Sequence, residues 1–148
     1  MKEHTMQEEE RPAAERILRD ARSIAVLGMK DPSESMEPAA QIPDYLRQQG
    51  YRIIPVNPEL VEAGYPDAVA TLGELPEPPD VVEVFRNSEA VGEHAAELLA
   101  LNPKAVWLQL GIRNDAVAER LRAAKIEVVQ DACMLKVHAA MVRTAMVG

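Results

Sequence analysis

The sequence contains a single cysteine, Cys133, a single phenylalanine and only 3% aromatic residues. One cysteine excludes an internal disulfide and is typical of a reducing compartment, so we expect a cytoplasmic protein. The shortage of aromatic side chains leaves no stacking surface for single-stranded nucleic acid. No apolar run approaches the roughly 18 residues of a membrane-spanning helix, so we expect no membrane span. The three histidines show no ligand spacing, and we predict no metal site.

Positive charge is also scarce. The chain has 16 basic and 24 acidic residues, and its net charge of −8 argues against a nucleic-acid partner. Four glutamates and one lysine fall within the first ten residues, which we interpret as a disordered acidic tail over residues 1–10. The rest of the 148 residues, 11–148, is long enough for one domain with a buried core.

What is present is a regular alternation of strand and helix patterns. It predicts an α/β fold, a Rossmann-like doubly wound sheet of about five mainly parallel strands in three α/β/α layers. We expect strands at residues 23–28, 52–56, 80–85, 104–110 and 126–130, a first helix at 12–21 and a last helix at 134–146.

Four residues mark the other helix boundaries. Gly50 suits the C′ position of a helix that ends near residue 49. Ser88 and Asn114 are the expected N-caps of the following helices. Pro43 either interrupts the helix before Gly50 or begins its regular part, and the sequence does not decide between the two. A short edge strand is expected near residues 68–70.

The ligand of a doubly wound sheet lies outside the carboxyl ends of the strands, where the strand order reverses. Three of the five predicted strand ends carry a cation, namely Lys30, Arg86 and Arg113. Positive charge at this edge of an acidic protein favours a phosphorylated ligand, although loops are polar and some basic residues fall there by chance. The segments that follow the strands are residues 28–30, 57–58, 85–87, 109–113 and 131–133.

Two features argue against a nicotinamide dinucleotide. The full glycine fingerprint is missing, since only Gly28 follows the first strand. The second strand ends in Asn57, where a dinucleotide-binding domain has the acid that binds the ribose. Both residues also have purely structural readings, because a glycine often forms a tight turn and an asparagine can cap its own turn.

Four motifs follow one another along the chain: residues 24–28 (IAVLG), 50–58 (GYRIIPVNP), 80–86 (DVVEVFR) and 106–111 (VWLQLG). Together they resemble the small bacterial CoA-binding-domain proteins, which are similar to the N-terminal CoA-binding domain of the succinyl-CoA synthetase α-subunit. The resemblance covers residues 17–138 and is much more specific than the glycine alone.

The resemblance implies that coenzyme A lies along the strand ends. The turn after the first strand would meet the phosphates, Lys30 and Arg86 would supply charge, and Met29, Val56 and Phe85 would supply apolar surface. Carried onto this chain, the contact residues are Gly28, Met29, Lys30, Val56, Asn57, Pro58, Phe85 and Arg86, with Gln109, Gly111, Ile112 and Cys133 along the far wall.

The chain also departs from these families. The loop at 29–33 is longer and more acidic than the glycine-rich loop of the synthetase, and Glu59 follows Pro58 where the synthetase has a lysine nearby. Ala132 stands where the small proteins usually have an arginine. The second domain that carries the synthetase's phosphohistidine has no counterpart in this sequence.

These observations favour a stand-alone CoA- or acyl-CoA-binding protein without evident catalytic machinery. No Ser–His–Asp set or paired carboxylates can be placed together. A dyad of Cys133 with His138 is one alternative, but a histidine on a helix surface is the simpler reading, and Cys133 could instead form a mixed disulfide with CoA. The rival functions are a small NAD(P)-dependent oxidoreductase and a ligand-free interaction module.

Overall fold

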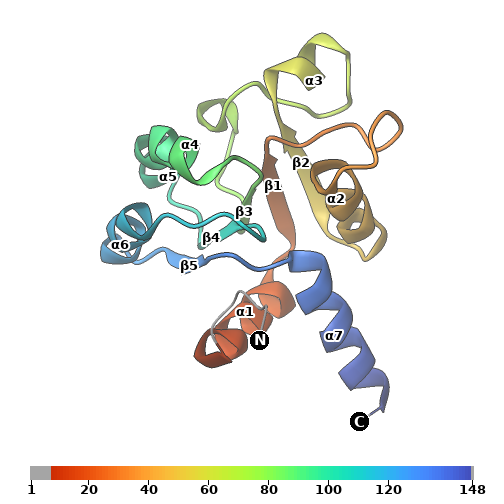
Figure 1. Ribbon diagram of the computed structural model, residues 1–148. Helices are drawn as coiled ribbons and strands as arrows, with labels where there is room; N and C mark the ends of the chain where they lie inside the picture. The colour runs from red at the N-terminus through yellow and green to blue at the C-terminus, as the bar shows by residue number, and fades with distance from the viewer. Residues whose placement is uncertain (1–7, 148) are drawn as a thin grey trace.

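The computed structural model describes residues 8–147 (Figure 1). The first seven residues of the predicted acidic tail lie outside this range. The remaining three, Glu8–Glu10, form a short 3-10 helix, η1, that leads directly into α1 (Arg11–Asp20). These three residues therefore have a regular structure that the sequence did not predict.

Within residues 8–147, one sheet of five parallel strands forms the centre of the fold, in the order β2-β1-β3-β4-β5. This arrangement confirms the predicted doubly wound α/β fold. The order reverses between β1 and β3, so the switch point lies where the carboxyl ends of these two strands separate. The strands are β1 (Ser23–Leu27), β2 (Arg52–Val56), β3 (Val81–Val84), β4 (Ala105–Leu108) and β5 (Glu127–Val129).

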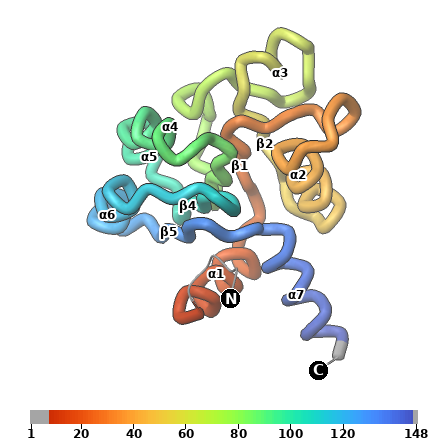
Figure 2. Tube along the Cα trace, viewed as in Figure 1, coloured from red at the N-terminus to blue at the C-terminus, as the bar shows by residue number. Residues whose placement is uncertain are grey.

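Helices cover both faces of the sheet. On one face lie α1, α2 (Pro38–Gln48) and α7 (Met134–Val147), and their apolar residues share one core with that side of the sheet. On the other face lie α4 (Ser88–Val91), α5 (Ala95–Leu101) and α6 (Asp115–Ala123). The first and last helices, α1 and α7, lie side by side (Figures 1 and 2). No helix within residues 8–147 has the length and apolar character needed to cross a membrane.

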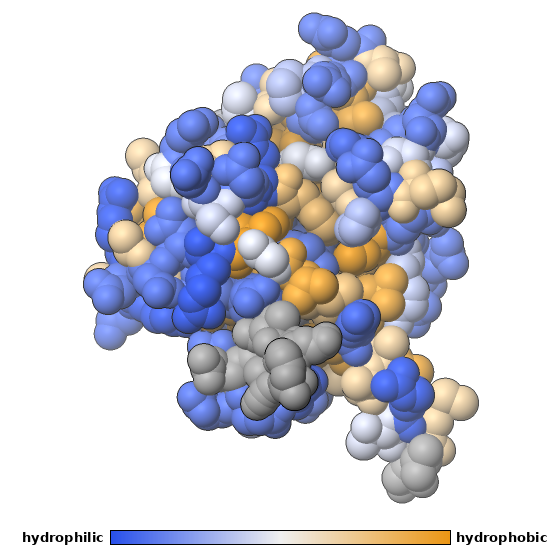
Figure 3. Space-filling view, in the orientation of Figure 1, coloured by the Kyte–Doolittle hydropathy of each residue, from blue (hydrophilic) through white to orange (hydrophobic). Residues whose placement is uncertain are grey.

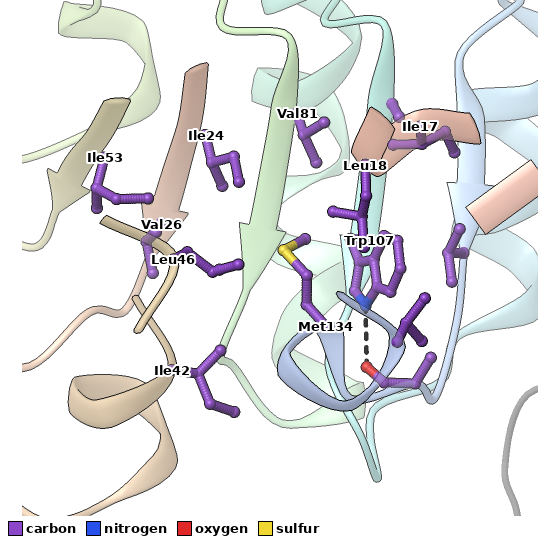
Figure 4. Close-up of a cluster of buried hydrophobic side chains, with 14 of the residues drawn as sticks. Ile17, Leu18, Ile24, Val26, Ile42, Leu46, Ile53, Val81, Trp107 and Met134 are labelled. Carbon is purple, nitrogen blue, oxygen red and sulfur yellow. Dashed lines mark hydrogen bonds between the residues drawn. The ribbon is translucent and has the colours of Figure 1, made fainter. Parts of the chain in front are cut away.

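Successive strand residues divide between the two cores. In β1, Ile24 and Val26 face the core of α1, α2 and α7, whereas Ala25 and Leu27 face the core of α4, α5 and α6. Trp107 is the largest fully buried side chain, and its indole N–H donates to the carbonyl oxygen of Ala132 at 2.9 Å (Figure 4). This hydrogen bond satisfies the polar end of the ring and fixes the chain just before α7.

Several boundaries differ from the prediction. Pro43 lies inside α2 and is buried, so the helix includes it. Asn87, not Ser88, caps α4, because its side-chain oxygen accepts from the amide of Ala90 at 2.8 Å. The predicted helix after this cap is divided by the 3-10 turn η3 (Gly92–His94). The expected edge strand is reduced to one parallel bridge between Val56 and Val69.

Candidate functional site

The turn after β1 crosses the end of β3 in close contact. Gly28 has a φ of +86°, and a Cβ atom at this position would lie 2.7 Å from the carbonyl oxygen of Phe85. The amide of Gly28 donates to the carbonyl oxygen of Val56 at 2.9 Å, and the amide of Phe85 donates to Leu27 at 2.9 Å. The backbone at the switch point is therefore held tightly, and only a glycine fits there.

The side chain of Arg86 passes beside this turn. The same Cβ position at Gly28 is 3.6 Å from Cδ of Arg86. Arg86 is exposed, and its guanidinium has no hydrogen bond or ion pair with any of residues 8–147. The structure thus brings together two of the predicted site residues, a glycine turn and a cation, at the switch point.

The other two predicted cations have acidic partners. Lys30 Nζ lies 2.7 Å from Oε1 of Glu37, and the Lys30 amide donates to the carbonyl oxygen of Ala39 at 3.1 Å. Arg113 Nε lies 3.2 Å from Oδ1 of Asp115. An anion that binds at this edge would have to compete with Glu37 or Asp115 for these groups.

Asn57 connects the ends of β1 and β2. Its Oδ1 accepts from the amide of Glu59 at 2.9 Å and so caps the short helix α3 (Pro58–Glu62). Its Nδ2 donates to the carbonyl oxygen of Met29 at 2.9 Å. Both the oxygen and the nitrogen of the side-chain amide are therefore hydrogen-bonded within the protein, and Asn57 has the structural role of a capping residue. Pro58 occupies the first position of α3.

Two of the three side chains expected to supply apolar surface do not do so. Met29 is 0% exposed and Val56 is 1% exposed, because both turn into the cores. Phe85 is half-buried, as are Ile112 and Cys133. Figure 3 shows that apolar side chains gather in the middle of one face, between α4 and α6 on one side and α2 on the other. Any ligand contact of Met29 or Val56 would be through the backbone.

The loops after β4 and β5 are bound to each other. Asp131 adopts a left-handed conformation with a φ of 57°, and its Oδ1 accepts from the amide of Gly111 at 2.6 Å. Its own amide donates to the carbonyl oxygen of Ile112 at 3.1 Å. Gln109 Oε1 accepts from the amide of Met134 at 3.3 Å, at the start of α7. These contacts hold the loops after β4 and β5 together. The only sequence signal for this role of Asp131 is its position after a strand.

Cys133 and His138 do not form a dyad within the part of the chain that the structure describes. His138 Nδ1 lies 2.9 Å from the hydroxyl of Tyr45, and its ring makes edge contacts with Tyr45 and Tyr51 at centroid distances of 5.6 Å. Burial lowers the pKa of His138. The histidine therefore joins α7 to α2 and is more enclosed than a residue on an open helix surface.

Glu83 is a buried carboxyl group that the sequence reading did not single out. It is 0% exposed, and neither carboxyl oxygen has a hydrogen-bond partner among residues 8–147. Burial raises the pKa of Glu83 to about 8. Its neighbours in the sheet are Val26 and Trp107. The sequence does contain the signal, since alternation along β3 places Glu83 on the same face as the buried Val81.

An all-parallel doubly wound sheet with a glycine turn at its switch point defines a Rossmann-like α/β domain. Comparison with known proteins narrows this class. Residues 22–139 match the model of the CoA binding domain family, and the chain belongs to that family.

Relatives span nearly the whole chain. The protein YneT of Bacillus subtilis (strain 168) is 33% identical over 134 residues, which cover 90% of this chain and 98% of YneT. The solved structure of cell-free ID.343 from Thermus thermophilus is 42% identical with a TM-score of 0.77, and the match covers 88% of this chain and 97% of that one. A hypothetical protein from Pyrococcus horikoshii OT3 shares the fold at 21% identity, with a TM-score of 0.81 and coverages of 96% and 99%.

Proposed function

We propose that this chain is a stand-alone binding protein for coenzyme A or an acyl-CoA, with the ligand at the carboxyl edge of the sheet between the ends of β1 and β3. The observation that carries this proposal is the exposed side chain of Arg86. Its Cδ lies next to the Gly28 turn at the switch point, and its guanidinium has no partner among the described residues. Membership of the CoA binding domain family supports the choice of CoA over other phosphorylated ligands.

The polar part of the ligand would lie at the turn after β1. Arg86 would form charge-assisted hydrogen bonds with a phosphate group. Lys30 would join it only by exchanging Glu37 for the phosphate. The amides of Gly28 and Lys30 already donate to Val56 and Ala39, so of the backbone amides at residues 28–30 only that of Met29 would be free for the phosphate.

The apolar part of the ligand would lie against the half-buried side chains of the neighbouring loops. Phe85 follows β3, and Ile112 and Cys133 follow β4 and β5. Gly111 would form part of the same wall, whereas the predicted contact residue Gln109 is buried and supports the wall through its bond to Met134. This division places phosphate and pantetheine on chemically different sides of one crevice.

A side-by-side titration of the purified protein with CoA, acetyl-CoA, NAD, NADPH and ATP tests the proposal. Ligand at about a hundred times its Kd adds roughly 2.7 kcal/mol to the stability of the folded state, which raises the Tm by several degrees. We expect such a shift with the CoA species alone. A Tm shift with NADPH alone would contradict the proposal and favour an NADPH-dependent reductase. The absence of a Tm shift with every ligand would favour an interaction module.

A further inference from the structure

Helix α7 has a second apolar stripe, and the fold covers only its first half. Leu135 packs against the core, whereas Val142 and Met146 are exposed. Met134 and Val137 are buried against the sheet, whereas Leu135, Ala139, Val142 and Met146 follow one another at spacings of four, three and four and so share a different side of the helix. Exposure increases along this stripe and reaches 38% at Val142 and 80% at Met146. Figure 1 shows the second half of α7 running away from the sheet.

The charge next to this stripe is positive. Lys136 and Arg143 lie one residue after Leu135 and Val142, on the same flank of the stripe. The fourteen residues of α7 include no aspartate or glutamate, although the chain as a whole has a net charge of −8. A surface that covers the stripe should therefore be apolar with an acidic rim.

Such a surface exists on the opposite face of the same molecule. A groove runs between α5 and the segment that contains the 3-10 helix η2 (Leu72–Glu74). Two acids lie on it, Glu77, which is exposed and without a partner among residues 8–147, and Glu97, which contacts His94 Nδ1 at 2.9 Å. The apolar lining of this acidic groove consists of Leu72, Leu75, Pro76, Pro78, Ala100 and Leu101.

We propose that the α7 stripe of one copy docks into the acidic groove of a second copy of this chain. The apolar residues of the stripe would lie on the apolar lining, as an amphipathic helix lies in a groove, and Lys136 and Arg143 would meet Glu77 and Glu97. The stripe and the groove belong to opposite faces of the sheet. One contact therefore leaves a free stripe and a free groove at the two ends, and assembly proceeds head to tail.

Sedimentation velocity over a wide range of protein concentration measures this association. We expect the wild-type chain to self-associate and two charge-reversed variants to do so at least about tenfold more weakly. The stripe variant carries Lys136→Glu and Arg143→Glu, and the groove variant carries Glu77→Lys and Glu97→Lys. Glu119→Lys, on the exposed side of α6, is the control and should associate as the wild type does.

An equimolar mixture of the two variants gives the sharpest result. Each contact between a stripe variant and a groove variant again joins opposite charges. The mixture should therefore associate more tightly than either variant does alone. A mixture that stays monomeric overturns the proposal, and so does a wild-type chain that is monomeric at every concentration. A groove variant that associates as the wild type does would show that α7 pairs without the groove and would equally overturn it. Far-UV circular dichroism confirms that each variant is folded.

Discussion

A Cβ atom on Gly28 would meet the carbonyl oxygen of Phe85 at 2.7 Å. The close approach joins the ends of β1 and β3, the two strands between which the sheet order reverses. The glycine is therefore required by the protein itself, before any ligand is present. Loss of ligand binding after a bulky substitution at residue 28 would not by itself identify a phosphate contact.

Gly28→Val is expected to destabilise the fold by about 2–4 kcal/mol, because the new side chain must adopt a left-handed backbone and displace a neighbouring carbonyl group. Urea denaturation measures this loss. Gly92→Ala is the matched control, since a Cβ there meets nothing within 4 Å, and it should leave stability unchanged or slightly raised. Equal stability of the two variants would contradict the geometry at the switch point.

Asn57→Asp should destabilise the protein by roughly 1–2 kcal/mol. The carboxylate keeps the acceptor for the amide of Glu59 but loses the donor to Met29 and brings a negative charge to that carbonyl oxygen. In the control variant, Asn87→Asp, the side chain acts only as an acceptor toward Ala90, so the effect should be close to zero. Chemical denaturation measures the free energy of unfolding of both variants. An equal loss in the two would contradict the role of the Asn57 amide as a donor to Met29.

Glu83→Gln should stabilise the protein increasingly as the pH rises. The pKa of Glu83 is raised to about 8 in the folded protein, from an ordinary value of 4.5. Below pH 4.5 the buried, neutral Glu83 therefore costs no stability. As the pH rises from 4.5 toward 8, Glu83 ionises in the unfolded chain but not in the folded protein, so the free energy of unfolding falls. The linkage amounts to about 1.4 kcal/mol per pH unit and to on the order of 3 kcal/mol at pH 7.

Denaturation of the wild type and the Glu83→Gln variant at pH 5 and at pH 8 tests this prediction. The difference in unfolding free energy between the two proteins should be larger at pH 8. A difference that does not change with pH would mean that the carboxyl group reaches water or a partner in solution.

Arg86→Ala should weaken CoA binding about ten- to a hundredfold, the effect of losing one charge-assisted hydrogen bond of roughly 1.5–3 kcal/mol. The free protein should keep its stability, since Arg86 contacts no charged partner within residues 8–147. Arg113→Ala is the matched control, because Arg113 is paired with Asp115. Isothermal titration calorimetry that finds wild-type affinity in the Arg86 variant would remove this residue from the site.

Cys133 should form a mixed disulfide when the protein is treated with oxidised CoA. It is the single cysteine of the chain, it is half-buried, and it follows β5 at the same edge as the proposed ligand. Mass spectrometry of the intact protein should show one CoA-sized adduct, which a reductant removes and which Cys133→Ser abolishes. If the wild type forms no adduct, Cys133 does not lie near the thiol end of the bound ligand.

The fold could be predicted because periodic apolar patterns determine which elements form and which faces they bury. Asn114 was correctly expected to cap α6, and its Oδ1 accepts from Val117 at 3.1 Å. The cap of α4 was misplaced by one residue, since Asn87 and Ser88 are adjacent and both are good capping residues. Such a choice depends on where the preceding strand ends, which the local sequence does not specify.

The site was harder to predict, because proximity to a strand end does not determine the direction of a side chain. Met29 follows β1 directly yet turns into the core, and Lys30 finds an acid seven residues further along the chain. Arg86 and the carboxyl group of Glu83 have no partner among residues 8–147, and both facts are set by the tertiary structure. They depend on which groups the folded chain brings near, and no local pattern reports them.

The amides of Gly28 and Lys30 are already bonded within the protein. A phosphate at this turn would then depend on the amide of Met29, which donates to no backbone carbonyl within residues 8–147, and on the side chain of Arg86. A side chain can be exchanged by a single codon change without altering the course of the backbone. The scaffold can therefore remain constant while its ligand preference changes in the course of evolution. Among relatives with this sheet, the residue at the position of Arg86 should vary with the ligand, whereas the glycine at the position of Gly28 should not.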